Sequence, residues 1–365
     1  MAREWLHSID ISQNEKKQLP GIVSVAVIIP YYNGARFIER ALRSVRRQTV
    51  QPREIFIVND GSTPAEAKFL DDLCRSSCED FTVIHKENGG QGSARNAGAN
   101  ASNCTYLCFL DQDDFYLPNH IEDLLLAIPK DDGRFGFLYA DLSLADIDGN
   151  FITSTILDGR GKHPKSSVME MISGDMFVLP SASLILRDAF MAVGGFDVQF
   201  KGYEDDDLFL RLFRAGYTGH FLNRAVTAWC IHTESTSFSI HMVRSRFLYF
   251  KKLYTLFPDN KRQNRFFFRD CLVPRFERPF IVESIKAKYE NSIYEREIFG
   301  MLEEFLGIVM ENRWISMRHK YKLRLIVIAV RWFPRKALKT SIKIAWLMGY
   351  AKAFREWGEG RLDSI

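Results

Sequence analysis

The chain has 365 residues, a hydrophobic content of 46% and a formal net charge of +4 at pH 7. At this length one hydrophobic core rarely suffices, so we expect one large domain and a smaller appendage. The apolar runs are shorter than the roughly 18 residues of a membrane-spanning helix, and the N-terminal stretch lacks the apolar segment of a secretion signal. These features predict a cytoplasmic protein and argue against a secreted or membrane-spanning one.

The positive charge is concentrated near the C-terminal end. Residues 313–361 contain 13 Lys or Arg and two Glu, which leaves a net charge of −7 for the rest of the chain. A basic segment of this kind is typical of proteins that contact anionic membranes or nucleic acids. No recognisable nucleic-acid-binding motif accompanies it, so we expect no nucleic-acid partner.

The first half of the chain alternates short apolar runs with amphipathic helical patterns. Strands are predicted at residues 25–29, 54–58, 82–85 and 106–110, with helices at 35–49, from 63 onward and through Arg95. Thr63 and Glu66 fit the N-cap and the capping-box partner of the second helix. The alternation predicts an α/β, Rossmann-like fold with a mostly parallel sheet, in which the loops after the strands meet at one edge.

Polar and aromatic residues cluster in the loops after these predicted strands. They are Tyr31, Tyr32 and Asn33 after the first strand, Asp60 after the second, Lys86, Asn88 and Arg95 after the third, and Asp111, Asp113 and Asp114 after the fourth. In open α/β sheets ligands bind at this edge. Aromatic rings can stack on a nucleobase, cations can bind phosphate, and clustered carboxylates can bind Mg²⁺ or Mn²⁺.

Both the aspartate cluster and the glycine-rich loop have simpler interpretations. The aspartates also fit a solvated acidic turn that caps the next helix, and the loop from Asn88 to Gly92 also fits an ordinary flexible turn. Gly90-x-Gly92 is followed by Arg95 where a dinucleotide-binding fingerprint has a third glycine, and the chain contains no P-loop motif. The sequence therefore supports neither a nicotinamide-dinucleotide site nor a P-loop.

A second acidic cluster opens the helix predicted around Leu208 and Leu212. Glu204, Asp205 and the two aspartates after them lie in its first turn, where the helix dipole favours acidic residues whatever their function. His232 follows a further predicted strand. A lone histidine is usually structural, and the alternative is a ligand of a metal ion or a diphosphate.

Between these two clusters the pattern predicts a strand at 135–140 and then a hairpin. Asp148-Gly149-Asn150 separates two alternating segments, 143–147 and 151–155, and suits a tight turn. Residues 158–167 form a polar loop, which fits either a lid over a site or a featureless surface excursion.

Four motifs follow one another along the first third of the chain: VAVIIPYYNG, FIVNDGST, NGGQGSARNAG and FLDQDD. Together they resemble the GT-A glycosyltransferases of family 2, which use nucleotide-sugars. The resemblance implies that Asp60 hydrogen-bonds the nucleobase and that the segment from Pro30 to Tyr32 lies against it. It also implies that Arg95 helps to hold the nucleotide and that Asp111 lies near the ribose.

The same resemblance implies a metal site and a catalytic base. Asp113 would bind the Mn²⁺ or Mg²⁺ ion that bridges the two phosphates, with Asp114 beside it and His232 in place to complete the site. In the family's Glu-Asp motif the aspartate is the base, which puts that role on Asp205 with Glu204 in the acceptor site. Inversion at the anomeric carbon is also implied by the family.

The resemblance covers residues 22–240 and sets the expected domains. Residues 1–21 are an N-terminal extension, and 241–365 are a helical, basic C-terminal region. The GT-A catalytic domain between them divides into a nucleotide half at 22–118 and an acceptor half at 119–240.

In the C-terminal region, helices are predicted at 314–333 and 335–357. The second carries an apolar stripe that includes Leu338 and Trp346, with lysines at its side. We expect this segment to lie on an anionic membrane surface. The alternative is that it packs against the rest of the chain.

These features predict a metal-dependent transfer of a single sugar from a nucleoside diphosphate sugar, expected to be a UDP-sugar, to a hydroxyl of a carbohydrate or lipid-linked glycan. The Gln-x-x-Arg-Trp motif of processive synthases has only an echo at 310–314, far beyond Asp205. Polysaccharide assembly on the inner face of the cell membrane is the expected setting. Two alternatives remain: a nucleotidyltransferase acting on a sugar phosphate, and a non-catalytic, membrane-attached module that binds nucleotide-sugars.

Overall fold

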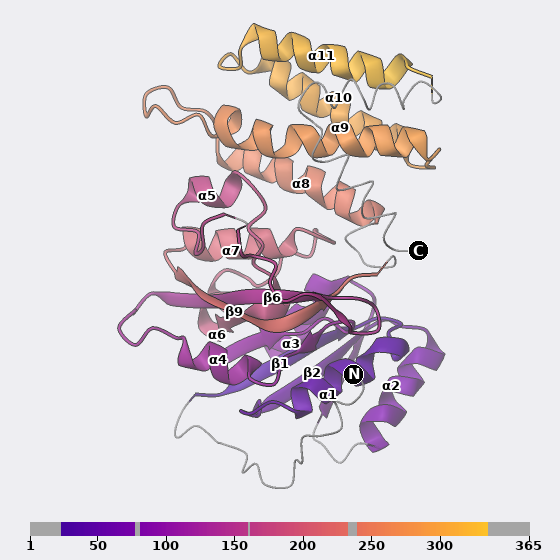
Figure 1. Ribbon diagram of the computed structural model, residues 1–365, viewed down its shortest axis with the longest axis vertical. Coiled ribbons are helices and arrows are strands. Elements are labelled where there is room, and N and C mark those ends of the chain that lie inside the picture. Colours follow the sequence, from indigo (N-terminus) through magenta and orange to yellow (C-terminus); the bar gives the residue numbers. More distant parts are fainter. Residues whose placement is uncertain (1–22, 77–80, 160, 233–238, 335–365) are drawn as a thin grey trace. The chain divides into compact units, whose positions relative to one another are not determined.

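The computed structural model describes residues 23–76, 81–159, 161–232 and 239–334 (Figure 1). They belong to two compact units. Unit 1 comprises Met1–Ser166 with Phe177–Ser235, and unit 2 comprises Ser167–Met176 with Thr236–Ile365. The short segment Ser167–Met176 therefore groups with helices that follow it much later in the chain.

Unit 1 is built on one nine-stranded sheet in the order β3-β2-β1-β4-β8-β6-β9-β5, with β7 paired to β6. The strands are β1 (Val25–Tyr31), β2 (Glu54–Asp60), β3 (Phe81–Lys86), β4 (Tyr106–Phe109), β5 (Phe115–Tyr116), β6 (Phe135–Ala145), β7 (Phe151–Thr153), β8 (Ser183–Leu186) and β9 (Thr218–Cys230). The helices of this unit are α1 (Ala35–Arg46), α2 (Pro64–Ser76), α3 (Gln91–Ala101), α4 (His120–Leu126), α6 (Arg187–Ala192) and α7 (Glu204–Arg214), with a 3-10 turn η1 (Pro180–Ala182).

The first four long strands, β3, β2, β1 and β4, are mutually parallel. Every residue of the central strand β1 is buried, as expected for a parallel strand covered on both faces. Helix α3 packs against β1 and β2. The predicted α/β fold with a mostly parallel sheet is confirmed.

The prediction of two separate strands at 135–140 and 143–147 is wrong. They form the single strand β6, which pairs with β8 in antiparallel fashion and with β9 in parallel. Irregular register near Asp141 lets one strand continue through the break in the apolar pattern. The predicted tight turn is present: Gly149 has φ of +88°, a conformation that glycine adopts without strain, and β7 pairs back onto β6.

The start of α2 follows the prediction only in part. Thr63 accepts a hydrogen bond from the Glu66 backbone N–H at 3.4 Å, as an N-cap does. The carboxylate of Glu66 does not close a capping box, however. It accepts hydrogen bonds from the Tyr31 hydroxyl at 2.5 Å and the Ala35 backbone N–H at 3.0 Å, and so connects α2 to the end of β1.

Unit 2 is helical. Its elements are α5 (Val168–Ile172), α8 (Ile240–Leu256), the π-helical turn η3 (Phe268–Leu272), α9 (Val273–Tyr289), α10 (Glu295–Glu311) and α11 (Met317–Trp332). Phe250 of α8 is the centre of its aromatic core, where Phe276, Phe280 and Phe305 surround it at ring-centroid distances of 5.2–5.7 Å. In Figure 1 the long helices α8 to α11 lie one beside the next.

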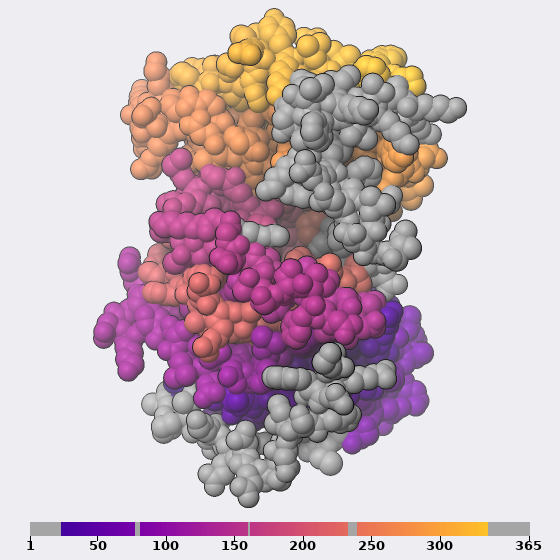
Figure 2. Space-filling view, in the orientation of Figure 1, coloured from indigo at the N-terminus to yellow at the C-terminus, as the bar shows by residue number. Residues whose placement is uncertain are grey.

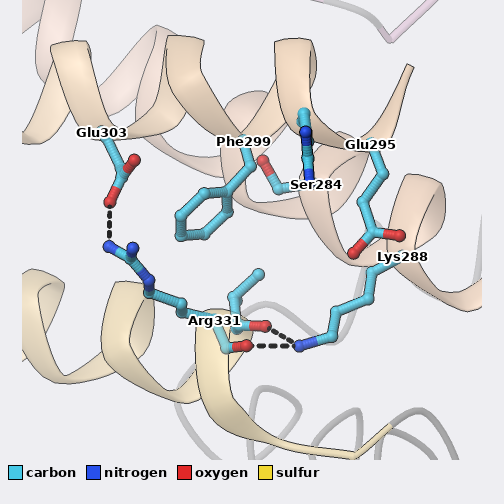
Figure 3. Close-up of a pocket in the computed structure, with 8 residues that line it drawn as sticks. Ser284, Lys288, Glu295, Phe299, Glu303 and Arg331 are labelled. Atoms are coloured by element: carbon cyan, nitrogen blue, oxygen red, sulfur yellow. Dashed lines mark hydrogen bonds and ion pairs between the residues drawn. The ribbon is translucent and has the colours of Figure 1, made fainter. Parts of the chain in front are cut away.

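The ends of α11 are fixed by side-chain hydrogen bonds. Ser316 accepts one from the His319 backbone N–H, which makes it the N-cap and explains why the helix begins later than predicted. At the other end, Lys288 donates to the carbonyls of Val330 and Arg331 (Figure 3). The helix predicted at 335–357 lies outside the described residues. Within the described ranges, no helix combines the length and apolar character needed to cross a membrane.

Gly98 of α3 allows a close approach between this helix and the sheet. A Cβ atom there would lie 2.5 Å from Cγ2 of the buried Ile28. Replacing Gly98 with alanine is therefore expected to lower the free energy of unfolding by about 1–3 kcal/mol through overpacking. Urea denaturation measures the change.

A matched control is Gly300→Ala in α10, where a Cβ would meet no atom of the described residues within 4 Å. Here the same substitution is expected to raise the free energy of unfolding by up to about 1 kcal/mol, because alanine is the better helix former. If the Gly98 variant were as stable as the parent, the tight packing of α3 on the sheet would be contradicted.

Candidate active site

The parallel strands bring the residues predicted for the nucleotide site to one edge of the sheet. Tyr31 is the last residue of β1, Asp60 of β2 and Lys86 of β3, and Asp111 lies just beyond β4. Asp60 and Lys86 are register partners on neighbouring strands. The carboxyl ends of the strands thus form the site edge, where ligands bind in open α/β sheets.

Asp60 holds the glycine-rich loop in place. Its buried carboxylate accepts hydrogen bonds from Lys86 Nζ at 2.6 Å and from the backbone N–H groups of Gly89 at 2.9 Å and Gly90 at 2.7 Å. Asn88 donates from its side-chain amide to the Asp60 carbonyl at 2.8 Å. The glycine-rich loop is therefore held by these hydrogen bonds rather than free to move, and Asp60 determines its position.

The two tyrosines after β1 face different surroundings. The Tyr31 side chain is fully buried, and burial together with its hydrogen bond to Glu66 raises the pKa of its hydroxyl. Tyr32 is 50% exposed, and its backbone N–H and carbonyl are both hydrogen-bonded by the side chain of Gln112. At this edge, therefore, Pro30 and Tyr31 can contact a ligand only through their backbone atoms, whereas the ring of Tyr32 is accessible.

Arg95 joins the two predicted clusters. Its side chain is 1% exposed, and its guanidinium donates to a carboxylate oxygen of Glu204 at 2.8 Å and to one of Asp111. The ring of Phe196 lies 5.4 Å from the guanidinium carbon. Gln91, at the start of the same helix, also donates to Glu204. One buried cation therefore links the aspartates after β4 to the first turn of α7.

The residues predicted to bind metal are partly assembled. Asp113 accepts a hydrogen bond from His232 Nε2 at 2.8 Å, so these two side chains lie next to each other at the site edge. Asp114 is buried and accepts a hydrogen bond from the Cys230 backbone N–H at 2.9 Å. In the described part of the chain, no three His, Cys, Asp or Glu side chains are arranged to hold a metal ion.

These residues nevertheless fit a divalent cation. Burial, and then the neighbouring Asp111, raise the pKa of the Asp113 carboxyl; burial, and then Asp113 and Asp111, do the same for Asp114. Such crowding of carboxylates is relieved by a cation. Carboxylate and imidazole are both ligands of Mn²⁺. The side chain of Asp113 is 24% exposed and that of His232 is 8% exposed, and Nδ1 of His232 has no hydrogen-bond partner in the described part of the chain.

In the second acidic cluster, Asp205 differs from its neighbours. Glu204, Asp206 and Asp207 are buried, whereas Asp205 is partly exposed. Asp207 accepts a hydrogen bond from Arg211 Nε at 2.7 Å within α7. Burial of its carboxyl oxygens, and then the adjacent Glu204 and Asp206, raise the pKa of Asp205 well above that of an ordinary aspartate. A carboxylate with a raised pKa is a better proton acceptor than an ordinary one, and Asp205 is the residue of this turn that is not fully buried.

Three residues that support the site were missed in the sequence. Gln112 clasps the backbone of Tyr32, and Gln91 holds Glu204. Arg40 of α1 donates to the carbonyls of Asp113 at 2.6 Å and Ile147 at 2.8 Å. No local sequence pattern marks these contacts, because each of them joins residues that are more than 70 positions apart in the chain.

Comparison with solved structures gives the class of the fold. TarS of S. aureus, in complex with UDP, superposes with a TM-score of 0.57 over 88% of this chain and 92% of that chain, at 15% identity. The mannosyltransferase PcManGT from Pyrobaculum calidifontis, in complex with GDP-Man and Mn²⁺, superposes with a TM-score of 0.51 over 90% of this chain and 91% of that chain, at 15% identity. The fold is the GT-A fold of glycosyltransferases.

Sequence comparison then gives the family. Residues 26–141 match the family described as "Glycosyl transferase family 2", and this part of the chain is a domain of that family. An uncharacterized glycosyltransferase of Rickettsia prowazekii (strain Madrid E) is 31% identical over 219 residues, 58% of this chain and 65% of that protein. The chondroitin synthase of Pasteurella multocida (strain Pm70) is 28% identical over 223 residues, 61% of this chain and 22% of that protein.

The matched part of the chain thus covers less than two thirds of the length of each of these relatives, so the similarity is to a domain within them.

Replacing Arg95 tests the link between the two clusters. Arg95→Met leaves the buried Glu204 carboxylate without its cation, so we expect the free energy of unfolding to fall by about 3–5 kcal/mol. In the double variant Arg95→Met/Glu204→Gln the loss should be smaller than the sum of the two single losses, because the second change removes the uncompensated charge. Chemical denaturation of the four proteins measures this, and strictly additive losses would contradict the pairing.

Proposed function

We propose that the protein transfers a single sugar from a nucleoside diphosphate sugar to a hydroxyl group of a carbohydrate or lipid-linked glycan, with inversion at the anomeric carbon. One observation carries the proposal. Arg95 binds both Asp111, beside the nucleotide edge, and Glu204, beside the partly exposed Asp205. A donor at the strand ends and a base on α7 would therefore be held at a fixed separation, which is what a direct displacement requires.

The donor is proposed to bind along the site edge. The solved structures with this fold hold UDP, UDP-GlcNAc or GDP-Man, which supports a nucleotide-sugar here, with a UDP-sugar as the first candidate. The exposed ring of Tyr32 lies where a nucleobase could stack. Asp60 and its clasped loop would border the base, and Lys86 and Asn88 belong to that network.

Asp205 is proposed as the catalytic base. A sugar hydroxyl is a poor nucleophile at neutral pH, and a positioned carboxylate that takes its proton contributes roughly 10²–10⁴ in rate. The raised pKa of Asp205 makes its ionised form a better proton acceptor than an ordinary aspartate. Glu204, fixed by Arg95 and Gln91, is then a positioning residue for the acceptor site.

Asp113 and His232 are proposed to hold a divalent cation, Mn²⁺ or Mg²⁺, with Asp114 supporting them from the interior. When bound, such an ion would neutralise negative charge on the departing diphosphate. Transfer activity that persisted unchanged in EDTA would contradict this assignment.

Two other functions are less well supported. A nucleotidyltransferase would attack phosphorus and release pyrophosphate, and it would need no base at Asp205. A non-catalytic nucleotide-sugar-binding module would release no nucleoside diphosphate with any acceptor. Identifying the phosphate-containing product, nucleoside diphosphate or pyrophosphate, separates all three functions.

Asp205→Asn keeps the shape of the side chain but cannot accept a proton. Donor affinity should therefore stay within about twofold of the parent, while turnover falls by roughly 10²–10⁴. Calorimetry with the nucleotide and a transfer assay measure the two quantities. The control is Asp188→Asn on the exposed start of α6, which should change neither. An equal loss of donor affinity and turnover would place Asp205 in the nucleotide site instead.

Asp205 also determines how turnover is expected to depend on pH. Only the ionised form of Asp205 can act as base, so turnover should fall as pH drops through its raised pKa. The acidic limb of kcat/KM should consequently lie clearly above the value of about 3.9 for an ordinary aspartate. A profile that remained flat down to about pH 4 would contradict the assignment.

We also propose that unit 2 attaches to an anionic membrane surface through α11. Exposed apolar side chains follow one face of this helix: Met317 (55% exposed), Tyr321 (56%), Leu325 (65%), Ile328 (46%) and Trp332 (74%). The exposed cations Arg318 and Arg324 lie on the same helix. Figure 2 shows α11, in yellow, at the surface of the helical unit. An apolar stripe with basic neighbours is typical of helices that lie in a membrane interface.

Removing the stripe should therefore release the protein from membranes. The double variant Leu325→Gln/Trp332→Gln is expected to bind vesicles containing phosphatidylglycerol at least about tenfold more weakly, since each lost side chain contributes on the order of 1.5–3 kcal/mol when fully buried. Vesicle sedimentation measures binding. Ile293→Gln, which changes an 88% exposed residue outside the stripe, is the matched control. Full-length protein that ignored these vesicles at low salt would contradict the proposal.

A further inference from the structure

One pocket of unit 2 lies at the start of α11. It has a volume of about 510 Å³, and its walls include Arg269, Arg278, Glu277, Trp314 and His319. These residues come from η3, α9, the turn before α11 and the first turn of α11 itself. Neither the family match at residues 26–141 nor the proposed transfer reaction involves this pocket.

The guanidinium of Arg278 is the chemical feature that distinguishes the pocket. Its Nε and Nη2 atoms are buried and have no hydrogen-bond partner in the described part of the chain. These two nitrogens form one edge of the planar group, and their N–H bonds point the same way. That edge is the one that binds two oxygens of a phosphate or carboxylate at once. Leaving buried donors unpaired is costly, so a ligand that paired them would be stabilised.

The other charged walls of the pocket already have partners. Arg269 forms a two-point ion pair with Asp270 at 2.6 and 2.8 Å. His319 Nε2 lies 2.6 Å from a carboxylate oxygen of Glu277, and this hydrogen bond raises the pKa of His319. Glu277 is therefore compensated within the pocket, and Arg278 remains as the cation whose binding edge is unused.

Another pocket of this unit is drawn in Figure 3 and lies between α9, α10 and α11. In Figure 3, Lys288 is directed to the carbonyls of Val330 and Arg331, and Arg331 is directed to Glu303. Lys288 and Arg331 thus have protein partners, and Arg296 also lines this pocket. By contrast, the edge of Arg278 formed by Nε and Nη2 has no such partner among the described residues.

We propose that the pocket at Arg278 binds a phosphate group carried by a larger molecule. The unused guanidinium edge supplies two donors, and the start of α11, a helix of 16 residues, adds the positive end of its dipole through the turn at Ser316. A volume of about 510 Å³ exceeds the space that one phosphate needs, and the ring of Trp314 offers an apolar wall for its carrier. Because the edge is closed to water in the structure, binding includes a turn of the Arg278 side chain towards the pocket.

Two carriers share this chemistry, a soluble sugar phosphate and a lipid headgroup. His319 contacts α9, and it follows Met317 of the exposed stripe by two residues, so the two side chains project to nearly opposite sides of α11. The pocket is therefore not part of the apolar face proposed to meet the membrane. The experiment separates the two carriers.

The test is calorimetric titration of the full chain with inorganic phosphate and with glucose 1-phosphate, at constant ionic strength. Loss of a two-point charged hydrogen bond should weaken binding to Arg278→Gln by about tenfold or more. Arg134→Gln removes the same charge from an exposed residue of unit 1, outside the pocket and outside α11, and its affinity should stay within about twofold of the parent. Arg278→Lys keeps the charge but not the paired edge, so it should bind nearly as weakly as the glutamine variant.

Folding is checked by thermal unfolding without ligand, where Arg278→Gln should be no less stable than the parent because no protein hydrogen bond at Nε or Nη2 is lost.

Dependence of binding on Arg278 with glucose 1-phosphate identifies a soluble carrier. Dependence seen only with phosphatidylglycerol vesicles identifies a lipid headgroup. Equal effects of the Arg278 and Arg134 substitutions, or no dependence on Arg278 in either arm, would overturn the proposal. Nucleotide binding and sugar transfer are measured separately, so failure here leaves the proposed function untouched.

Discussion

The buried guanidinium of Arg95 is the constraint on which the candidate site depends. A charge that is 1% exposed is costly unless carboxylates surround it, and Asp111 and Glu204 supply them from elements far apart in the chain. Neither carboxylate can move far without leaving the cation uncompensated. The aspartates after β4 and the first turn of α7 are consequently fixed with respect to each other before any ligand arrives, and such preorganisation is what a transfer site needs.

Asp60 plays a comparable part at the other end of the edge. By accepting hydrogen bonds from Lys86 and from two backbone N–H groups, it holds the glycine-rich loop and the start of α3, the helix that carries Arg95. Glu66 joins Tyr31 to α2 in a similar way. Asp60, which the family resemblance suggests as a ligand contact, and Glu66, predicted as a capping residue, thus both position loops of the site.

The sequence predicts well what depends on short-range pattern. Apolar runs such as Val25–Tyr31 locate the parallel strands, and the rule that their carboxyl ends share an edge brings Asp60 and Asp111 to one place. It does not predict contacts between distant elements. The bridge from Arg95 to Glu204 spans 109 residues, and β6 continues through a break in its pattern because β9 pairs with it. Similarly, the unpaired edge of Arg278 is visible only once its surroundings are known.

The central claim is that Arg95 couples the proposed nucleotide site at the strand ends to α7, the helix that carries the proposed base. Amide hydrogen exchange with and without UDP and Mn²⁺ tests it most directly. In the parent protein, nucleotide should slow exchange both in the loop after β4 and in the first turn of α7, because the Asp111–Arg95–Glu204 bridge transmits the ordering. In Arg95→Met the protection after β4 should remain in part while that of α7 is lost. Protection confined to the strand edge in the parent, with α7 unchanged, would contradict the account.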